Sequence, residues 1–214
     1  MIIQWFGLGN FSISGKMGGD DVTLITDPFS DDFGLKSARS MQANMVAQSH
    51  KGGYADNVGM VTASEGKRLF EVTHAGEYET GKIFVSGIHV PTKKFSQHTI
   101  YQAFFEEISV GFLGVLDRKL TDHEIEELGE IDILMLPVGG EDVLSPSDAA
   151  DVVAQVEPRV VIPYHYHIDK LKTGHGTVES FVKSIGVSPR KEQKLKISKS
   201  ALPEEDVELV ILEA

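Results

Sequence analysis

The sequence predicts an α/β protein in which two packed β-sheets carry helices on their outer faces. Two observations lead to this prediction. The first half of the chain consists of short β-rich runs separated by Gly, Asp and Pro, as in a meandering sheet. The second half alternates strand-like runs with helix-like runs. Strands followed by strand–helix alternation suit two sheets with helices outside them.

The strands expected in the first half follow one another closely. Each is a short apolar run with turn residues on either side. The runs cover residues 2–6, 22–26, 44–48, 82–90, 99–105 and 108–113. Residues 30–43, which are polar and contain glycine, interrupt the series and are expected to form a surface loop near the mouth of the site.

The second half opens with a helix start signal. Thr121 and Glu124 have the spacing of a capping box, which predicts a short helix ending at residue 128. Ser145 and Pro146 offer an N-cap and a proline at the first helical position, so a second helix is expected to reach residue 156. The remaining elements are a buried strand at 131–138, a strand at 159–163, a helix at 177–185 and closing strands at 194–198 and 207–212.

Composition limits the class of protein. With 214 residues, of which 41% are hydrophobic and 24% charged, the chain can bury one large core, so a single domain over residues 1–214 is expected. The chain contains no apolar run near the ~18–20 residues of a membrane span. It also shows no signal peptide, and we expect a soluble cytoplasmic protein with no membrane partner. Because there is no cysteine, any metal would be held by histidines and carboxylates.

The charge of the chain argues against nucleic acid as a partner. The formal net charge is −12, from 32 acidic and 20 basic residues, and such a chain repels a polyphosphate backbone. The basic residues gather at 190–199, which we interpret as the solvated face of a late strand.

Five short motifs then suggest a family. In chain order they are Ile3-Gln4-Trp5-Phe6-Gly7, Thr26-Asp27-Pro28-Phe29, Ser49-His50, Gly76-Glu77-Tyr78-Glu79, and a long run from Leu134 through Gly139-Gly140 to Tyr164-His165-Tyr166. In this order the sequence resembles the metallo-β-lactamase-fold hydrolases, in particular the small single-domain branch related to L-ascorbate-6-phosphate lactonase. The resemblance implies a four-layer αββα sandwich. It also implies one or two metal ions at the loop edge of the sheets, which activate a bound water.

The first metal-binding loop of the family is mostly missing from this sequence. Relatives carry His-x-His-x-Asp-His, of which His50 matches the first histidine. Gly52 takes the place of the second histidine. Asp56 and Asn57 align with the Asp-His pair only if one residue is inserted, and the amide oxygen of asparagine is a poor zinc ligand.

Other ligand positions of the family are changed as well. Val115 stands where relatives have a carboxylate that bridges the metals, and residues 7–11 lack the histidine often found there. Asp117 is expected to be a turn acid before a helix and not a displaced ligand. His165 matches the last family histidine, and His167 would share its face if the strand stayed extended that far.

The remaining candidates are expected to have structural roles. His89 and His98 are expected on a sheet surface, His74 could point at the mouth of the site, and His123 and His175 are expected at exposed helix starts. Gly139 and Gly140 belong to a segment that lines the metal cleft in relatives, although the simpler explanation is a tight turn that needs positive φ. Ser49 is not expected to act as a nucleophile with His50 and Asp56, because neighbours on a strand face opposite sides.

Three hypotheses for the function follow. The first is a protein with an eroded metal site and no resident metal, which binds a small molecule or a partner chain in a cleft formed by His50, Asp56, Asn57, Gly139, Gly140 and His165. The second is a metal-dependent hydrolase of a lactone or phosphoester, with zinc or manganese at a relocated mononuclear site drawn from His50, Asp56, His165 and His167. The third is an assembly subunit that forms a homo-oligomer through exposed sheet edges.

Overall fold

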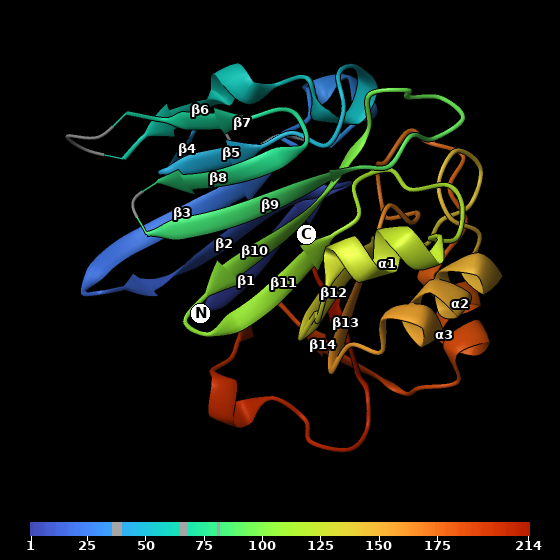
Figure 1. Ribbon diagram of the computed structural model, residues 1–214. Helices are drawn as coiled ribbons and strands as arrows, with labels where there is room; N and C mark the ends of the chain where they lie inside the picture. The colour runs from blue at the N-terminus through green and yellow to red at the C-terminus, as the bar shows by residue number, and fades with distance from the viewer. Residues whose placement is uncertain (36–39, 65–67, 81) are drawn as a thin grey trace.

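The computed structural model describes residues 1–35, 40–64, 68–80 and 82–214, which form two facing β-sheets (Figure 1). The six-stranded sheet runs, in spatial order, β15 (Leu195–Lys196), β1 (Ile2–Gly7), β2 (Asn10–Met17), β3 (Asp20–Thr26), β5 (Met45–Ala47) and β7 (Phe70–Val72). The eight-stranded sheet runs β14 (Pro189–Glu192), β16 (Glu208–Leu212), β13 (Val160–Tyr164), β12 (Ile133–Pro137), β11 (Ile108–Phe112), β10 (Thr99–Phe105), β9 (Ile83–His89) and β8 (Gly76–Thr80).

The hydrophobic core lies between the two sheets. Alternate residues of β1 point inward, so Ile3 and Trp5 are buried while Gln4 is exposed. The ring of Phe11 from β2 meets that of Tyr164 from the opposite sheet edge-on, with centroids 5.4 Å apart. Burial of each such side chain contributes about 1.5–3 kcal/mol, so the contact between the sheets is the main source of stability.

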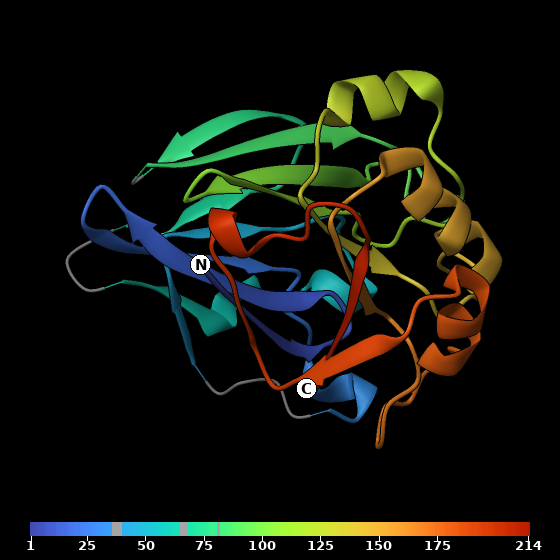
Figure 2. The same cartoon turned by 90° about the horizontal axis from the view of Figure 1, so that it is seen from below.

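The outer faces of the two sheets are covered differently. The helices α1 (Asp122–Leu128), α2 (Pro146–Val156) and α3 (Val178–Ile185) gather on one side of the molecule, away from the blue strands β1 to β3 (Figures 1 and 2). The six-stranded sheet instead packs Ile25 and Val46 against a two-stranded sheet of β4 (Met41–Ala43) and β6 (Val61–Ala63). The predicted sandwich is therefore confirmed, with a small sheet as its fourth layer. Among the described residues, no helix has both the length and the apolar character to cross a membrane.

Most elements were predicted from local signals. All three α-helices are confirmed, and Thr121 and Ser145 cap their helices as expected. Strands β2, β4, β6, β7, β8 and β14 were missed. In β2, serines and Gly15 interrupt the apolar pattern, and hydrogen bonds to β1 and β3 on both sides define the strand. The loop predicted at 30–43 ends in the buried strand β4, and its residues 36–39 lie outside the described part of the chain.

Four short 3₁₀ turns complete the described elements. They are η1 (Asp31–Phe33), η2 (Gly53–Ala55), η3 (Val58–Met60) and η4 (Lys199–Ala201). The turn η2 matters for function because it places Tyr54 over the ends of the strands, where its ring lies 4.9 Å from that of His165.

Candidate functional site

The candidate site lies where loops from the two sheets meet. Asp27 follows β3, Ser49 and His50 follow β5, and His165 follows β13. The strands β3 and β5 are parallel neighbours, as are β12 and β13, so their carboxyl ends lie at the same edge of each sheet. This is the edge at which side chains from different loops can converge.

A chain of hydrogen bonds fixes the ring of His50. Ser49 donates from its backbone N–H to Asp27 Oδ1 at 2.7 Å and from its hydroxyl to Asp27 Oδ2 at 2.5 Å. The same hydroxyl oxygen lies 2.8 Å from His50 Nδ1. While Asp27 is ionised, the only proton of the Ser49 hydroxyl goes to the carboxylate, so His50 Nδ1 must donate and Nε2 carries the lone pair. His50 Nε2 has no hydrogen-bond partner among the residues that the structure describes.

The expectation that Ser49 and His50 could not contact each other is wrong. Strand β5 ends at Ala47, so the two residues lie in a turn and their side chains meet. Asp27, and not Asp56, supplies the carboxylate. Because Ser49 is fully buried, it orients the ring of His50 and is closed to a substrate.

Burial sets the charge states of these groups. It raises the pKa of Asp27 to about 7, although the hydrogen bonds from Ser49 oppose the rise. Burial, followed by the nearby charges of His98 and Lys94, lowers the pKa of His50 to about 3. His50 is therefore a neutral imidazole at physiological pH.

His165 is held in an unusual backbone conformation. Its φ is 52°, in the left-handed region, and its side chain is 0% exposed. Neither ring nitrogen has a hydrogen-bond partner within the described part of the chain. Burial, followed by the charge of His175, holds the pKa of His165 well below its usual range. A fully buried imidazole with two unpaired nitrogens is rare enough to mark a functional site.

An aromatic side chain covers each of these two histidines. The ring of Phe95 lies 4.2 Å from that of His50, and the ring of Tyr54 lies 4.9 Å from that of His165. The ammonium of Lys94 lies 5.5 Å from the ring centroids of both aromatics, within cation–π range. We call Tyr54, Lys94 and Phe95 the cover, and it leaves only 2% of His50 exposed.

Asp142 fastens the cover to the loop after β12. Its Oδ2 accepts hydrogen bonds from the Tyr54 hydroxyl and from Lys94 Nζ, both at 3.0 Å. Although burial opposes the shift, hydrogen bonds from His175, Lys94 and Tyr54 hold the pKa of Asp142 below its usual range. The carboxylate is therefore ionised at neutral pH and closes the cleft with a charge-assisted contact.

His175 belongs to this site, which the sequence did not reveal. The exposed helix start predicted for it is wrong, because the side chain is buried and its Nε2 lies 3.0 Å from Asp142 Oδ1. Its Nδ1 lies 3.0 Å from the Thr173 hydroxyl. Ligand atoms of Glu141, Asp142 and His175 all lie within 4.8 Å of one another. The one signal in the sequence was the glycine on each side of His175, which permits close packing of backbones.

Three of the predicted site residues have exposure or hydrogen bonds that do not involve His50 or His165. Asp56 is exposed and accepts a hydrogen bond from the backbone of Gly52 at 2.6 Å. Asn57 donates its side-chain N–H to the carbonyl of Phe29 at 3.2 Å. His167 is exposed, because β13 ends at Tyr164 and the left-handed His165 breaks the extension that would have aligned the two rings.

The glycine pair after β12 does lie at the site. Gly140 has φ 71°, as expected of a tight turn. Gly139 packs directly on the backbone of His165, since an added Cβ would lie 2.0 Å from the His165 carbonyl oxygen. This approach fixes the loop after β12 against the loop after β13.

The other histidines are structural or exposed. His98 is buried, so the expectation of a sheet-surface residue is wrong. Its Nδ1 lies 2.7 Å from the carbonyl oxygen of Val90, and the backbone N–H of Val115 donates to its Nε2 at 3.1 Å. His89 and His123 are exposed as expected, and His74 is exposed as well. Asp117 accepts a hydrogen bond from the backbone of Lys93 at 2.9 Å, and in this way it supports the loop that carries Lys94 and Phe95 of the cover.

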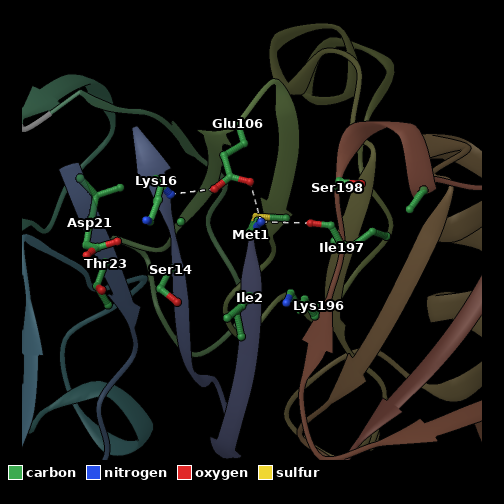
Figure 3. Close-up of a pocket in the computed structure, with 13 residues that line it drawn as sticks. Met1, Ile2, Ser14, Lys16, Asp21, Thr23, Glu106, Lys196, Ile197 and Ser198 are labelled. Carbon is green, nitrogen blue, oxygen red and sulfur yellow. Dashed lines mark hydrogen bonds and ion pairs between the residues drawn. The ribbon is translucent and has the colours of Figure 1, made fainter. Parts of the chain in front are cut away.

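A pocket of about 730 Å³ lies beside the start of β1, away from the residues of the candidate site (Figure 3). It surrounds the start of β1, where the Met1 ammonium binds Glu106 Oε2 at 2.6 Å and the carbonyl oxygen of Ile197 at 3.0 Å. The other carboxylate oxygen of Glu106 accepts from the backbone of Lys16 at 2.6 Å. These polar groups pair with one another, so the pocket offers less reactive chemistry than the loop edge around His50.

Comparisons with known proteins agree with this architecture. A family model described as a beta-lactamase superfamily domain matches residues 2–165. A UPF0173 protein of Pyrococcus abyssi is 24% identical over 208 residues, which cover 86% of this chain and 90% of that protein. A UPF0173 metal-dependent hydrolase of Symbiobacterium thermophilum is 48% identical over 50 residues, or 23% of this chain and 22% of that one. The crystal structure of a candidate Zn-dependent hydrolase of the metallo-β-lactamase superfamily from Thermotoga maritima superposes with a TM-score of 0.79 at 28% identity, covering 100% of both chains.

Proposed function

Because the chain belongs to the metallo-β-lactamase-fold family, whose members include proteins named metal-dependent hydrolases, we propose that it keeps the family's cleft but not the family's metal centre. Its function in this proposal is the non-catalytic binding of a small molecule in a single domain over residues 1–214. The observation that carries the proposal is the closed pair of His50 and His165. Both have unpaired nitrogens, and both lie beneath the cover.

The donors at the family's positions do not fit a metal centre of the family type. A catalytic zinc needs about three protein ligands and one open position. Of the family positions named above, His50 and His165 keep a histidine. Two further buried donors near His50 are engaged elsewhere, because both oxygens of Asp27 accept from Ser49 and His98 Nε2 accepts from the backbone of Val115. Within the described residues, the one group of three or more His, Asp or Glu ligands lies at Glu141, Asp142 and His175 and does not include His50.

The same atoms can recognise a small molecule. While Asp27 is ionised, His50 Nε2 is an acceptor whose ring is held by Ser49, and His165 offers one donor and one acceptor as a neutral imidazole. A buried polar atom without a partner costs about 1–3 kcal/mol, so a ligand that pairs with these nitrogens would recover that energy. We infer a polar ligand that carries hydrogen-bond donors and enters when the cover moves aside.

Calorimetric binding on chelator-treated protein tests this function. Ligands found in a thermal-shift screen of small polar metabolites should bind the wild-type protein and lose affinity in His50→Ala. The exposed residue His89 gives the matched control, so His89→Ala should bind as the wild type does. Hydrolysis of a lactone or phosphoester that requires His50 and added zinc would refute the proposal.

The alternative is a metal-dependent hydrolase with a relocated mononuclear site. Asp56 and His167 are exposed, and neither belongs to the group of ligand atoms that the described residues bring together, so two donors of the set expected from sequence are outside it. The observation that favours this alternative is the cluster of Glu141, Asp142 and His175. Turnover of a lactone or phosphoester that depends on His175 and not on His50 would select it.

A further inference from the structure

Three loops bring possible metal ligands together beside the cover. Glu141 and Asp142 lie on the loop after β12, His165 follows β13, and His175 lies in the segment that precedes α3. With the exception of His165, none of these residues matches a family ligand position quoted above. The family's metal centre therefore does not account for this cluster.

The backbone holds His175 firmly in place. The N–H of Gly176 donates to the carbonyl of Gly139 at 2.8 Å, and the N–H of His167 donates to the carbonyl of Gly176 at 2.8 Å. The segment around His175 is thus fastened to both neighbouring loops. Such positioning by main-chain hydrogen bonds is what a preformed binding site requires.

Glycine residues make room for the cluster. A Cβ added at Gly174 would lie 2.4 and 2.5 Å from the two carboxylate oxygens of Glu141. A Cβ added at Gly139 would lie 2.8 Å from the Cβ of His175. The Glu141 carboxylate therefore rests on bare backbone next to His175, although Glu141 itself is exposed and has φ 63°.

His165 provides independent evidence that the cluster binds a ligand. It is fully buried, and its ring nitrogens are unpaired in the described structure. Its ring centroid lies 5.3 Å from that of His175. Zinc–nitrogen bonds of about 2.0–2.1 Å place an imidazole centroid about 3.2 Å from the metal, so two imidazoles on one tetrahedral zinc have centroids about 5.2 Å apart. The observed separation is close to that value, although the ligand atoms that already lie within 4.8 Å of one another are those of Glu141, Asp142 and His175 and not those of His165.

We propose that His175, Asp142 and Glu141 bind one divalent transition metal ion, of which zinc is the best fit, and that the ion draws in the unpaired ring of His165 as a fourth ligand. Two imidazoles and two carboxylates suit zinc, and the two negative charges balance the ion. Asp142 Oδ1 faces His175 and would bind the metal, while Oδ2 keeps its contacts with Tyr54 and Lys94. The Thr173 hydroxyl can donate or accept, so it supports His175 with or without the metal.

Four protein ligands leave no open position, which is typical of a structural metal. The ion would lock the loop after β12 to the cover and so keep the cleft closed. This inference goes beyond the proposed binding function and does not depend on it, because it concerns an ion beside the cleft and not a ligand of His50.

Zinc titration tests the site. Chelator-treated protein titrated with zinc chloride should bind one ion per chain, and bound cobalt should show the intense visible absorption of a tetrahedral site. Asp142→Asn and His175→Gln should each lower the zinc affinity by more than about tenfold. Loss of a residue that only hydrogen-bonds to a metal ligand already lowers metal affinity by about tenfold or more. Glu141 is exposed, so Glu141→Gln should fold as the wild type does, and it should also lower the zinc affinity.

Matched controls separate this site from adventitious binding to surface histidines. The exposed residues His167 and His89 serve this purpose, so His167→Gln and His89→Gln should bind zinc with wild-type affinity. Two results would overturn the proposal. One is a wild-type protein that retains no zinc after desalting, and the other is a zinc affinity that Asp142→Asn and Glu141→Gln leave unchanged.

Discussion

Asp27→Asn should remove a large pH dependence from the stability of this protein. Asp27 is fully buried, and its pKa rises from the usual 3.8 to about 7 on folding. Between these two values Asp27 keeps a proton in the folded protein that it has lost in the unfolded chain, so the contribution of Asp27 to the free energy of unfolding falls as pH rises. This is opposite to the usual behaviour of a paired carboxylate, whose stabilisation is lost as pH falls.

The magnitude follows from the two pKa values. Each unit of difference is worth about 1.36 kcal/mol, so Asp27 alone should cost about 3 kcal/mol of stability between pH 4.5 and 7.5. Asparagine does not ionise and can still accept from the backbone of Ser49. From pH 4.5 to pH 7.5 the free energy of unfolding of the variant should therefore change more favourably than that of the wild type, by about 3 kcal/mol.

Urea unfolding at pH 4.5 and pH 7.5 measures the effect. The buried histidines also make stability depend on pH in this range, because they gain a proton in the unfolded chain and not in the folded protein. They do so in both proteins, so the difference between wild type and variant isolates Asp27. Free energies of unfolding that change with pH in parallel, within about 1 kcal/mol, would show that Asp27 is ionised throughout and would refute the reasoning.

Three further predictions concern the cover, the loop contact and the buried imidazoles. Tyr54→Phe removes the hydroxyl that donates to Asp142 and should cost about 1 kcal/mol in urea unfolding, whereas Tyr78→Phe, whose hydroxyl binds exposed backbone, should cost less. Gly139→Ala places a Cβ 2.0 Å from a carbonyl oxygen and should lower the free energy of unfolding by at least about 2 kcal/mol. Gly59 has open space around it, so the free energy of unfolding of Gly59→Ala should stay within about 0.5 kcal/mol of the wild-type value. Burial lowers the pKa of three imidazoles, so their stabilisation is present above the usual pKa of 6.5 and is lost as pH falls. The free energy of unfolding of Asp27→Asn, which lacks the opposing carboxylate, should therefore fall steadily from pH 6.5 to pH 4. A free energy of unfolding that does not change with pH over this range would contradict the prediction.

Local signals in the sequence were sufficient for much of the fold. The capping box at Thr121 and the Ser145-Pro146 helix start depend on residues within one turn, and both were predicted correctly. Strand β2 depends on partners at both sides, so its own pattern of serines and Gly15 did not indicate a strand. Local chemistry is visible in a sequence, whereas pairing between distant segments is not.

The site shows the same division. His50 and His165 were found because each ends a recognisable strand motif. The contribution of Asp27 depends on Ser49, 22 positions further along the chain, and that of His175 depends on loops that approach each other only in the folded protein. His167 was predicted to share a face with His165, and the positive φ of His165 prevented it. Backbone conformation at a single residue therefore decided which histidines converge.

Zinc content tests directly whether the protein has lost the family's metal centre at His50 and binds zinc at His175. We would measure it in the wild-type protein, His50→Ala and His175→Ala, each loaded with zinc chloride and desalted. A metal centre of the family type needs His50, whereas the site proposed beside the cover needs His175. We predict one zinc per wild-type chain, retained in His50→Ala and lost in His175→Ala. Two zinc ions per chain, or zinc that disappears with His50, would show that the family's metal centre is intact and would contradict the account.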